Sequence, residues 1–366
     1  MTLSSYITQR FLRNVTLVLV VIAGVAALLA SIENTRIAAA NNATLLEAGA
    51  LTLFQLPDIL SQTLPLIVML GALATFLGLS RNSEMVVVRA SGVSALQMLF
   101  LPALAAATLG VVAVTVVNPI VAYATVRAEE TKAVIQQRDI SILSVSAQGL
   151  WLRQGLETGQ TVIQAGRVSE DGALLSGVRL HQFDIDNRLV ARIEAQSAQL
   201  VENAWLLRGV RRWDLTERRQ GAEGLPEELV QLSLPTNLTR AQILDSFATP
   251  AAIEIWALPG FIRSLERAGF TATPHKVFFH SELARPALFI AMVLIGAGFS
   301  LRHVRFGQTG VMILLAIFAG FVLYFFKDIA ETLGGTGAIP ILLAAWSPPA
   351  AAILLATALL LHLEDG

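Results

Sequence analysis

Charged residues are so unevenly distributed along this sequence that six long runs contain no Asp, Glu, Lys or Arg. A helix that crosses the roughly 30 Å hydrocarbon core of a bilayer needs about 20 consecutive uncharged, mostly apolar residues. The segment must be helical because lipid offers no hydrogen-bond partner to backbone N–H and C=O groups. Runs of this length therefore predict six transmembrane helices. The runs are residues 14–32, 59–80, 90–126, 286–301, 306–326 and 332–363.

Two of these runs depart from the usual length of a span. The third has 37 residues, so it can cross the membrane and continue into water, with a kink or boundary predicted at Asn118-Pro119 because proline lacks the N–H that a helix needs. The fourth has only 16 residues, and we expect residues 277–285 to extend it. Glu282 and Arg285 lie three residues apart in that extension, so they share one helical face and are predicted to pair at the membrane interface.

Basic residues in the short loops predict the orientation of the spans, because cytoplasmic loops carry an excess of Lys and Arg. Six arginines either precede span one or lie between spans two and three or spans four and five. These are Arg10, Arg13, Arg81, Arg89, Arg302 and Arg305. The short loops on the other side have only Arg36 and Lys327. We therefore expect a multi-pass protein with both termini in the cytoplasm and residues 127–275 outside, in the periplasm if the cell has two membranes.

Residues 127–275 differ from the rest of the chain because they hold 34 of its 53 charged residues. Short segments of alternating polar and apolar character, separated by turn signals such as Glu170-Asp171-Gly172, predict antiparallel β-strands there. In the third strand the alternation changes parity, which predicts a β-bulge near His181-Gln182. The predicted strands are 150–153, 161–165, 174–185, 189–201, 204–215 and 229–234, followed by a helix at 261–268 that Gly269 caps.

The predicted strands form a sandwich or an open barrel, and its interior has two interpretations. The lining is predicted to be Trp151, Phe183, Ile193, Trp205, Leu207 and Trp213, with Arg208, Arg211 and Arg212 outside. Such a lining is either the ordinary apolar core of a sandwich, which composition alone favours, or a groove that holds lipid.

Several classes of function are disfavoured by what the sequence lacks. A Walker A loop binds ATP with a Gly-Lys pair, and none of the lysines Lys132, Lys276 and Lys327 follows a glycine. The six runs carry no Asp, Glu, Lys or Arg, which disfavours a proton relay. The histidines show no metal-ligand spacing, there is no cysteine, and the net charge of −1 gives no basic surface for nucleic acid. We therefore expect no catalytic site, no metal and no cofactor in this chain.

The loop between spans two and three contains a predicted short helix at about residues 82–92. Asn82 or Ser83 can cap this helix, Glu84 lies in its first turn, and Met85 with the valines after it gives an apolar ridge. Such a helix suits a groove in a cytoplasmic partner, with Glu84 meeting a cation at the rim. A solvated hairpin loop without a partner explains the same residues equally well.

Four stretches of the chain carry a family resemblance. They are Arg81-Asn-Ser-Glu-Met-Val-Val-Val-Arg-Ala-Ser-Gly92, Gln148-Gly-Leu-Trp-Leu-Arg153, Leu234-Pro-Thr-Asn-Leu-Thr239 and Gly320-Phe-Val-Leu-Tyr-Phe-Phe-Lys-Asp-Ile329. In sequence and order they resemble the lipopolysaccharide-export permeases of the LptF/LptG family, and the resemblance covers essentially the whole chain. The Gly-Leu-Trp stretch is more similar to the LptG branch than to the LptF branch.

The resemblance implies an α+β membrane protein with transmembrane helices in residues 1–126 and 276–366, three in each part, and a periplasmic antiparallel β-jellyroll in residues 127–275. It also implies an ABC-type exporter of the inner membrane, in which this permease pairs with an LptF-like permease and extracts lipopolysaccharide. An LptB-like ATPase dimer would bind the ATP, and the jellyroll would pass the lipid to a periplasmic bridge of LptC-like and LptA-like proteins.

The resemblance further assigns roles to the loop helix. In the family the acidic residue of this helix docks in the ATPase, and here that position is Glu84. Arg81, Met85 and Arg89 are its neighbours in the implied ATPase-binding surface.

The resemblance also implies where the substrate binds. Spans one and five line the lateral opening to the lipid cavity, which makes Phe318 of span five a candidate substrate contact. Phe183 and Trp205 would contact the lipid inside the jellyroll. The family has several basic residues at the outer end of span one, near the lipid phosphates, whereas this sequence has only Arg36 there.

The main alternative is a non-transporting membrane sensor or scaffold whose insert binds a periplasmic ligand, and a membrane-anchored hydrolase is a weaker third interpretation. The composition of the purified complex distinguishes them. An exporter half should bring an ATPase and a second six-span chain, and a sensor should bring neither.

Overall fold

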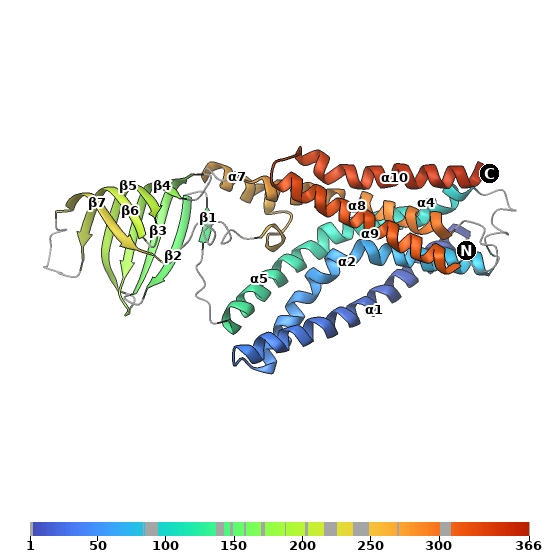
Figure 1. Cartoon of the computed structure of the whole chain (residues 1–366), viewed down its shortest axis with the longest axis horizontal. Helices are drawn as coiled ribbons and strands as arrows, with labels where there is room; N and C mark the ends of the chain where they lie inside the picture. Colours follow the sequence, from blue (N-terminus) through green and yellow to red (C-terminus); the bar gives the residue numbers. More distant parts are fainter. Residues whose placement is uncertain are drawn as a thin grey trace. The chain divides into compact units, whose positions relative to one another are not determined.

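The computed structural model describes residues 3–82, 84, 94–136, 143–146, 149–156, 159–169, 173–186, 188–201, 204–215, 225–236, 249–268, 271–300 and 309–365. The chain folds into two compact units (Figure 1). The helical unit comprises Met1–Gln136, Pro250–Ile255 and Thr273–Gly366, and the sheet unit comprises Gln137–Thr249 and Trp256–Ala272.

The helical unit contains six helices that are long and apolar enough to cross a membrane, counted over the described residues, as the uncharged runs predict. They are α1 (Leu3–Ala40), α2 (Leu45–Arg81), the continuous span of α4 (Ala95–Val112), η1 (Ala113–Val117) and α5 (Asn118–Ile135), then α8 (Thr273–Ser300), α9 (Thr309–Gly335) and α10 (Ile341–Asp365). Helices α1 and α2 extend well beyond their uncharged runs, and contacts such as the 3.0 Å hydrogen bond from Asn34 Nδ2 to Thr52 Oγ1 join the extensions. Thr44 and Glu47 form the capping box that begins α2.

The irregularity predicted at Asn118-Pro119 is present as a π-helical turn, Ala113–Val117, directly before it. Pro119 has no N–H to donate to the helix ladder, and a π-turn shifts the ladder by one residue at that point. The helix then continues as α5 to Ile135.

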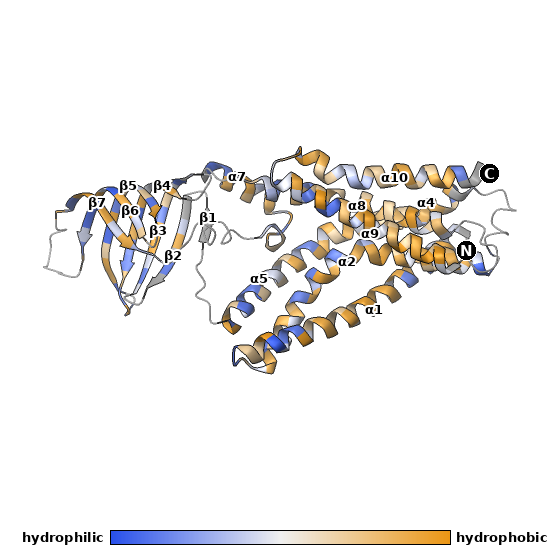
Figure 2. Ribbon diagram, viewed as in Figure 1, coloured by the Kyte–Doolittle hydropathy of each residue, from blue (hydrophilic) through white to orange (hydrophobic). Residues whose placement is uncertain are grey.

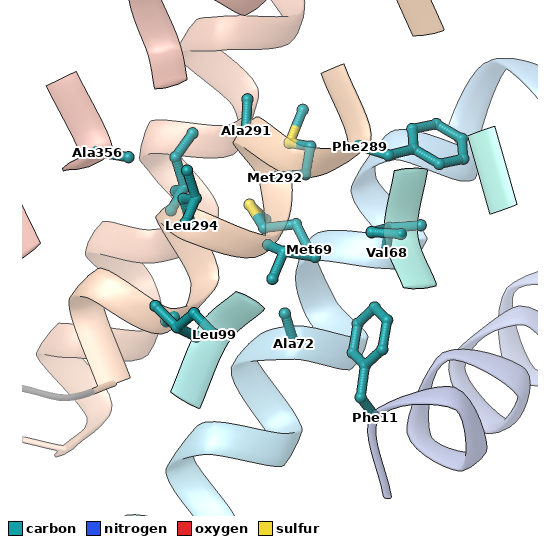
Figure 3. Packing of buried hydrophobic residues seen from close by; sticks show 14 of the residues in the cluster. Phe11, Val68, Met69, Ala72, Leu99, Phe289, Ala291, Met292, Leu294 and Ala356 are labelled. Atoms are coloured by element: carbon teal, nitrogen blue, oxygen red, sulfur yellow. The ribbon is translucent and has the colours of Figure 1, made fainter. Parts of the chain in front are cut away.

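Helix α8 is the centre of the helical unit, with 67% of its most apolar stretch buried. Its Phe289 belongs to an apolar core that includes Phe11 of α1 and Met69 of α2 (Figure 3). Small residues allow close approach of the helices, since a Cβ on Gly110 of α4 would lie only 2.5 Å from the Cα of Pro286 in α8. Helices α1 and α9 are the least buried, at 6% and 17% of the corresponding stretch, although both are apolar along most of their length (Figure 2).

The sheet unit is one antiparallel sheet of seven described strands whose order follows the sequence. All six predicted strands are present, and the sequence analysis missed one, β1, although its residues Leu143–Ser146 alternate between apolar and polar side chains. The strands are β1 (Leu143–Ser146), β2 (Gly149–Leu156), β3 (Gly159–Val168), β4 (Leu174–Phe183), β5 (Leu189–Val201), β6 (Ala204–Asp214) and β7 (Glu227–Pro235). The predicted helix is α7 (Leu258–Ala268), which packs against β1, β2 and β3, and Gly269 lies outside the described residues.

The sheet curls, so that strands far apart in its order meet. Gln154 of β2 donates a 3.3 Å hydrogen bond to the carbonyl oxygen of Pro235 in β7 and accepts one at 2.7 Å from the hydroxyl of Thr236. The predicted bulge is confirmed, because the pairing of β4 with β5 shifts its register between Gln182 and Phe183. A single curled sheet is closer to the expected open barrel than to a two-sheet sandwich.

Two tryptophans of the predicted lining lie on the other face of the sheet. In β6 the buried residues before Gly209 have odd numbers, and Trp205 is one of them. Gly209 has a φ of 61°, and after it the buried residue is the even-numbered Val210. Trp213 is therefore on the outer face, although it shares the odd numbering of Trp205. Trp151 is also outside, because its neighbour Leu152 is the buried residue of β2.

The arginines of β6 follow the same change of parity. Arg208 and Arg211 are exposed, as predicted, whereas Arg212 is half-buried on the inner face and the prediction for it was wrong. The cause is again the left-handed backbone at Gly209, which strict alternation of side chains does not anticipate.

Candidate functional site

Glu84, directly after α2, is held by side chains from the first turns of α1. Arg10 Nη1 lies 3.0 Å from Glu84 Oε1 and 3.2 Å from Oε2. The hydroxyl of Tyr6 donates to Oε2 at 3.2 Å, and Asn82 Nδ2 donates to Oε1 at 3.0 Å. Tyr6 and Arg10 are one helical turn apart, and the antiparallel packing of α1 on α2 brings the beginning of one helix to the end of the other.

The Glu84 carboxylate is ionised and only partly shielded from water. The hydrogen bond from Asn82, followed by that from Arg10, lowers the pKa of Glu84 below its ordinary value. Its side chain is 32% exposed and that of Arg10 is 17% exposed. The pair therefore lies at the surface of the helical unit, where a partner can reach the carboxylate while Arg10 continues to hold it.

The other predicted residues of the ATPase-binding surface are only partly described. Arg81 ends α2 and is exposed. Met85 and Arg89 lie outside the described residues, as does most of the loop helix predicted at 82–92. Sequence analysis missed the contribution of Tyr6 and Arg10, and the signal that could have identified them is their one-turn spacing at the beginning of an apolar helix that must pack against α2.

Helices α1 and α9 present apolar side chains that nothing in the described chain covers. On α9, Phe318 is 65% exposed, and Phe325 is 63% exposed at a position two turns further along. On α1, Leu28 is 67% exposed. These faces are available to lipid, to another chain or to an acyl substrate.

Arg36 lies on the extension of α1. Its side chain is 83% exposed, and its ion pair with Glu33 measures 3.9 Å. An exposed pair of this length contributes little stability.

The two candidate lipid contacts in the sheet are far apart. Phe183 is half-buried at the bulge and pairs with Leu189 at the start of β5, whereas Trp205 pairs with Leu200 near the end of that strand. They therefore lie towards opposite ends of the sheet. Trp205 is fully buried, and its indole Nε1 has no hydrogen-bond acceptor among the described residues. The other buried residues of β5 and β6 are alanine, leucine, isoleucine and valine, and a lipid chain could reach Trp205 only if the buried side chains separated.

A buried polar network in the helical unit was only half predicted. The ion pair of Glu282 with Arg285 is present, with Glu282 4% exposed. Arg285 also donates to the hydroxyl of Ser61 at 2.9 Å, and Asn118 Nδ2 lies 3.5 Å from Glu282 Oε2. The backbone N–H of Ile255 donates to Asn118 Oδ1 at 2.9 Å.

This network joins α2, α5 and α8 to Pro250–Ile255, a segment of the helical unit that precedes α7. Its buried carboxylate and guanidinium satisfy each other, which fits a role in holding the helices together. Among the described residues, no group of three or more His, Asp or Glu side chains has an arrangement that could hold a metal ion.

The chain is similar over nearly its whole length to one family of transport proteins. Residues 5–362 match the family model described as lipopolysaccharide export system permease LptF/LptG. The permease protein LptG of Escherichia coli strain K12 is 25% identical over 365 residues, which cover 98% of each chain. That of Haemophilus influenzae strain Rd is 22% identical over 359 residues, which cover 95% of this chain and 94% of the relative.

Proposed function

Because the chain belongs to the LptF/LptG family of lipopolysaccharide export permeases, we propose that it is one permease of an ABC-type exporter that extracts lipopolysaccharide from the inner membrane. The relatives are export permeases by name, and this chain is a multi-pass membrane protein with six apolar helices. In our proposal the partners are an LptF-like permease and an LptB-like ATPase dimer, and all ATP is bound by the ATPase.

The orientation we propose places the Glu84 end of the helical unit in the cytoplasm. Arg10, Arg13 and Arg81 all lie at this end, near the beginning of α1 and the end of α2. An excess of short-loop arginine marks the cytoplasmic side of a membrane protein. The sheet unit is then periplasmic, because an odd number of spans precedes it.

The contact of Glu84 with Arg10 is the observation that carries the proposal. A cytoplasmic ATPase that grips the loop after α2 at Glu84 pulls directly on α1, since Arg10 and Tyr6 of α1 hold the same carboxylate. Helix α1 is also the least buried of the six spans and exposes an apolar face. Movement at the ATPase would therefore be transmitted to a helix that is free to open or close a lateral entrance for lipid.

The path that we propose for the lipid is apolar throughout. Each CH₂ group moved into water costs roughly 0.8 kcal/mol, so a multi-acyl lipid must remain in contact with apolar surface from the membrane onwards. Exposed faces of α1 and α9, including Phe318, would form the entrance with the partner permease. The curled sheet would act as the periplasmic jellyroll, receive the acyl chains inside it, and pass them to an LptC-like and LptA-like bridge.

Purification of the complex tests this proposal. Mild detergent extraction of the tagged chain should yield an ATPase and a second six-span chain, and the reconstituted complex should release lipopolysaccharide to a periplasmic acceptor only with ATP. Glu84→Arg should abolish export and reduce the amount of ATPase recovered. Wild-type export by Glu84→Arg with the ATPase at its normal level would contradict the docking role, and a chain that purifies alone would favour the sensor or scaffold.

A further inference from the structure

Three arginines surround one glutamate on the outer face of the sheet. Arg179 of β4, Glu194 of β5 and Arg211 of β6 are register partners, so their side chains stand next to one another on strands about 4.8 Å apart. Glu194 accepts hydrogen bonds from Arg192 Nη2 at 2.6 Å and from Arg211 Nη2 at 3.0 Å, and Arg179 Nε lies 3.9 Å from Oε1. We call these four residues the arginine cluster.

Trp213 fixes two arginines of the cluster. The guanidinium carbon of Arg192 lies 5.4 Å from the centroid of the indole, and that of Arg211 lies 5.8 Å from it. Stacking on the ring and hydrogen bonding to Glu194 restrain both planar groups. Their remaining N–H donors are therefore held in position before any ligand arrives, which reduces the entropy that a ligand must offset.

The cluster keeps a surplus of positive charge at its surface. Three guanidinium groups surround one carboxylate, and the surplus remains when Glu228, the register partner of Arg211, is counted. Glu194 is 19% exposed, whereas the three arginine side chains are 49% to 59% exposed. The pKa of the adjacent His181 is lowered, chiefly by burial and further by repulsion from Arg192 and Arg179.

A hollow of about 650 Å³ adjoins the arginine cluster on the same face. Arg179, Glu194 and Arg211 line it, together with Gly177 and Gly209, whose φ angles of 64° and 61° reverse the side-chain alternation of their strands. Its volume falls within the roughly 300 to 1,000 Å³ of sites for small molecules. The hollow can therefore accept a group the size of a phosphorylated sugar.

We propose that this outer face binds the phosphate groups of the lipopolysaccharide head group, with the guanidinium forks of Arg179, Arg192 and Arg211 donating to phosphate oxygens. Planar, bidentate donors match phosphate geometry better than any other side chain. The inference rests on the proposed function, because the named cargo of the family is a glycolipid whose sugars carry phosphate.

The position of Trp151 supports a ligand that also contains sugar. Trp151 lies on the same outer face and is joined to Arg179 in register through Gln164 of β3. Aromatic rings offer a flat apolar surface to the carbon face of a sugar ring. Sugar contact at Trp151 and phosphate contact at the arginine cluster would fit one phosphorylated saccharide that lies across the strands.

Binding to the full chain in detergent tests the site. Fluorescent lipopolysaccharide, the same lipid after removal of its phosphates, and inorganic phosphate are the three probes. The cluster variant is Arg192→Gln with Arg211→Gln. Its matched control is Arg188→Gln with Arg208→Gln, which removes the same charge from exposed arginines of this sheet that do not pair with Glu194.

We expect the cluster variant to weaken lipopolysaccharide binding by about tenfold or more, since charge-assisted hydrogen bonds are lost, and the control to change it less than about twofold. Arg192→Lys with Arg211→Lys keeps the charge and a partner for Glu194, so it tests the fork geometry if the Gln variant fails to fold, and it should also weaken binding. The wild type and the cluster variants should bind the dephosphorylated lipid equally.

Three results would overturn the inference. The cluster variants could bind lipopolysaccharide like the wild type, the dephosphorylated lipid could show the same loss, or inorganic phosphate at low concentration could displace the lipid completely and so identify a free-phosphate site. ATP-driven export by the wild-type complex is measured in parallel. Absence of export would defeat the proposed function, whereas normal export with unchanged binding by the variants would defeat only this inference.

Discussion

Arg10 and Glu84 lie 74 residues apart in the sequence, yet one guanidinium nitrogen of Arg10 is 3.0 Å from one carboxylate oxygen of Glu84 and 3.2 Å from the other. The carboxylate that we propose as the handle for an ATPase is thus already bound within its own chain. A carboxylate can accept about four hydrogen bonds, and Arg10, Tyr6 and Asn82 already donate four to Glu84, so a partner that shares Glu84 with Arg10 must replace the bond from Tyr6 or Asn82.

The shared carboxylate predicts that Arg10 is needed for coupling and not for docking. Arg10→Gln should leave ATPase recovery unchanged while export per ATP falls about tenfold, because a charge-assisted connection between the loop and α1 is lost. Arg13→Gln, an exposed arginine of the same helix, is the control and should export normally. Unchanged export per ATP in Arg10→Gln would mean that α1 is moved by other contacts.

The connection also predicts a dependence on pH. The folded pKa of Glu84 is lowered from an ordinary value of 4.5, so its contribution to stability is fully present above that value and is lost as the pH falls through the lower, folded pKa. Thermal unfolding of wild type and Glu84→Gln in detergent, from about pH 7 down to about pH 3, measures this. The difference in midpoint should be constant near neutral pH and shrink in acid. A difference that grows in acid would have the wrong sign for this carboxylate.

The sequence predicted the helices and strands well because their signals are local. Uncharged runs located the six spans, and alternation located six strands and even the bulge beside Gln182. The faces of the sheet were harder to assign, because a left-handed residue such as Gly177 or Gly209 inverts the parity of the residues that follow it in its strand. Composition gives no warning of this, since glycine also occurs in strands with ordinary backbone angles.

The candidate site was predictable in part for the same reason. Glu84 follows from a local motif, whereas its contact with Arg10 depends on how α1 packs against α2, which no short stretch encodes. The pairing of Glu282 with Arg285 was visible from their spacing, but its burial depends on Ser61 and Asn118, which other helices supply.

The left-handed backbone at Gly209 makes this position sensitive to substitution. Gly209→Ala should destabilise the protein by about 1 to 2 kcal/mol, because an L-residue at a φ of 61° is strained and its Cβ would lie 2.8 Å from the side chain of Gln196. Gly166→Ala in β3 is the matched control, with ordinary contacts of 3.5 Å or more. The unfolding midpoints of the two variants in detergent provide the comparison, and equal stability would show that Gly209 can relax.

The buried pair predicts a larger effect than an exposed pair of the same spacing. Glu282→Gln should destabilise the chain by about 3 kcal/mol, since it leaves the guanidinium of Arg285 without its counter-charge. Glu130→Gln removes the partner of Arg127 from an exposed pair and should cost less than about 1 kcal/mol. A Glu282→Met, Arg285→Met double variant should recover most of the loss. Similar costs for the two single variants would mean that the buried pair is hydrated.

The fully buried Trp205 provides a test of whether the sheet interior opens for lipid. A photo-crosslinking residue at position 205 can reach an acyl chain only if the core around it separates, because the side chain has no exposed surface in the closed sheet. We expect lipopolysaccharide to be captured at this position during ATP hydrolysis and not with a non-hydrolysable analogue. The same crosslinker at Ile185, which is 80% exposed just after β4, controls for lipid that merely touches the sheet and should not respond to ATP in this way. Equal capture at position 205 with and without hydrolysis would mean that lipid enters a sheet that is open at rest, and no capture in either condition would mean that Trp205 is only part of the core.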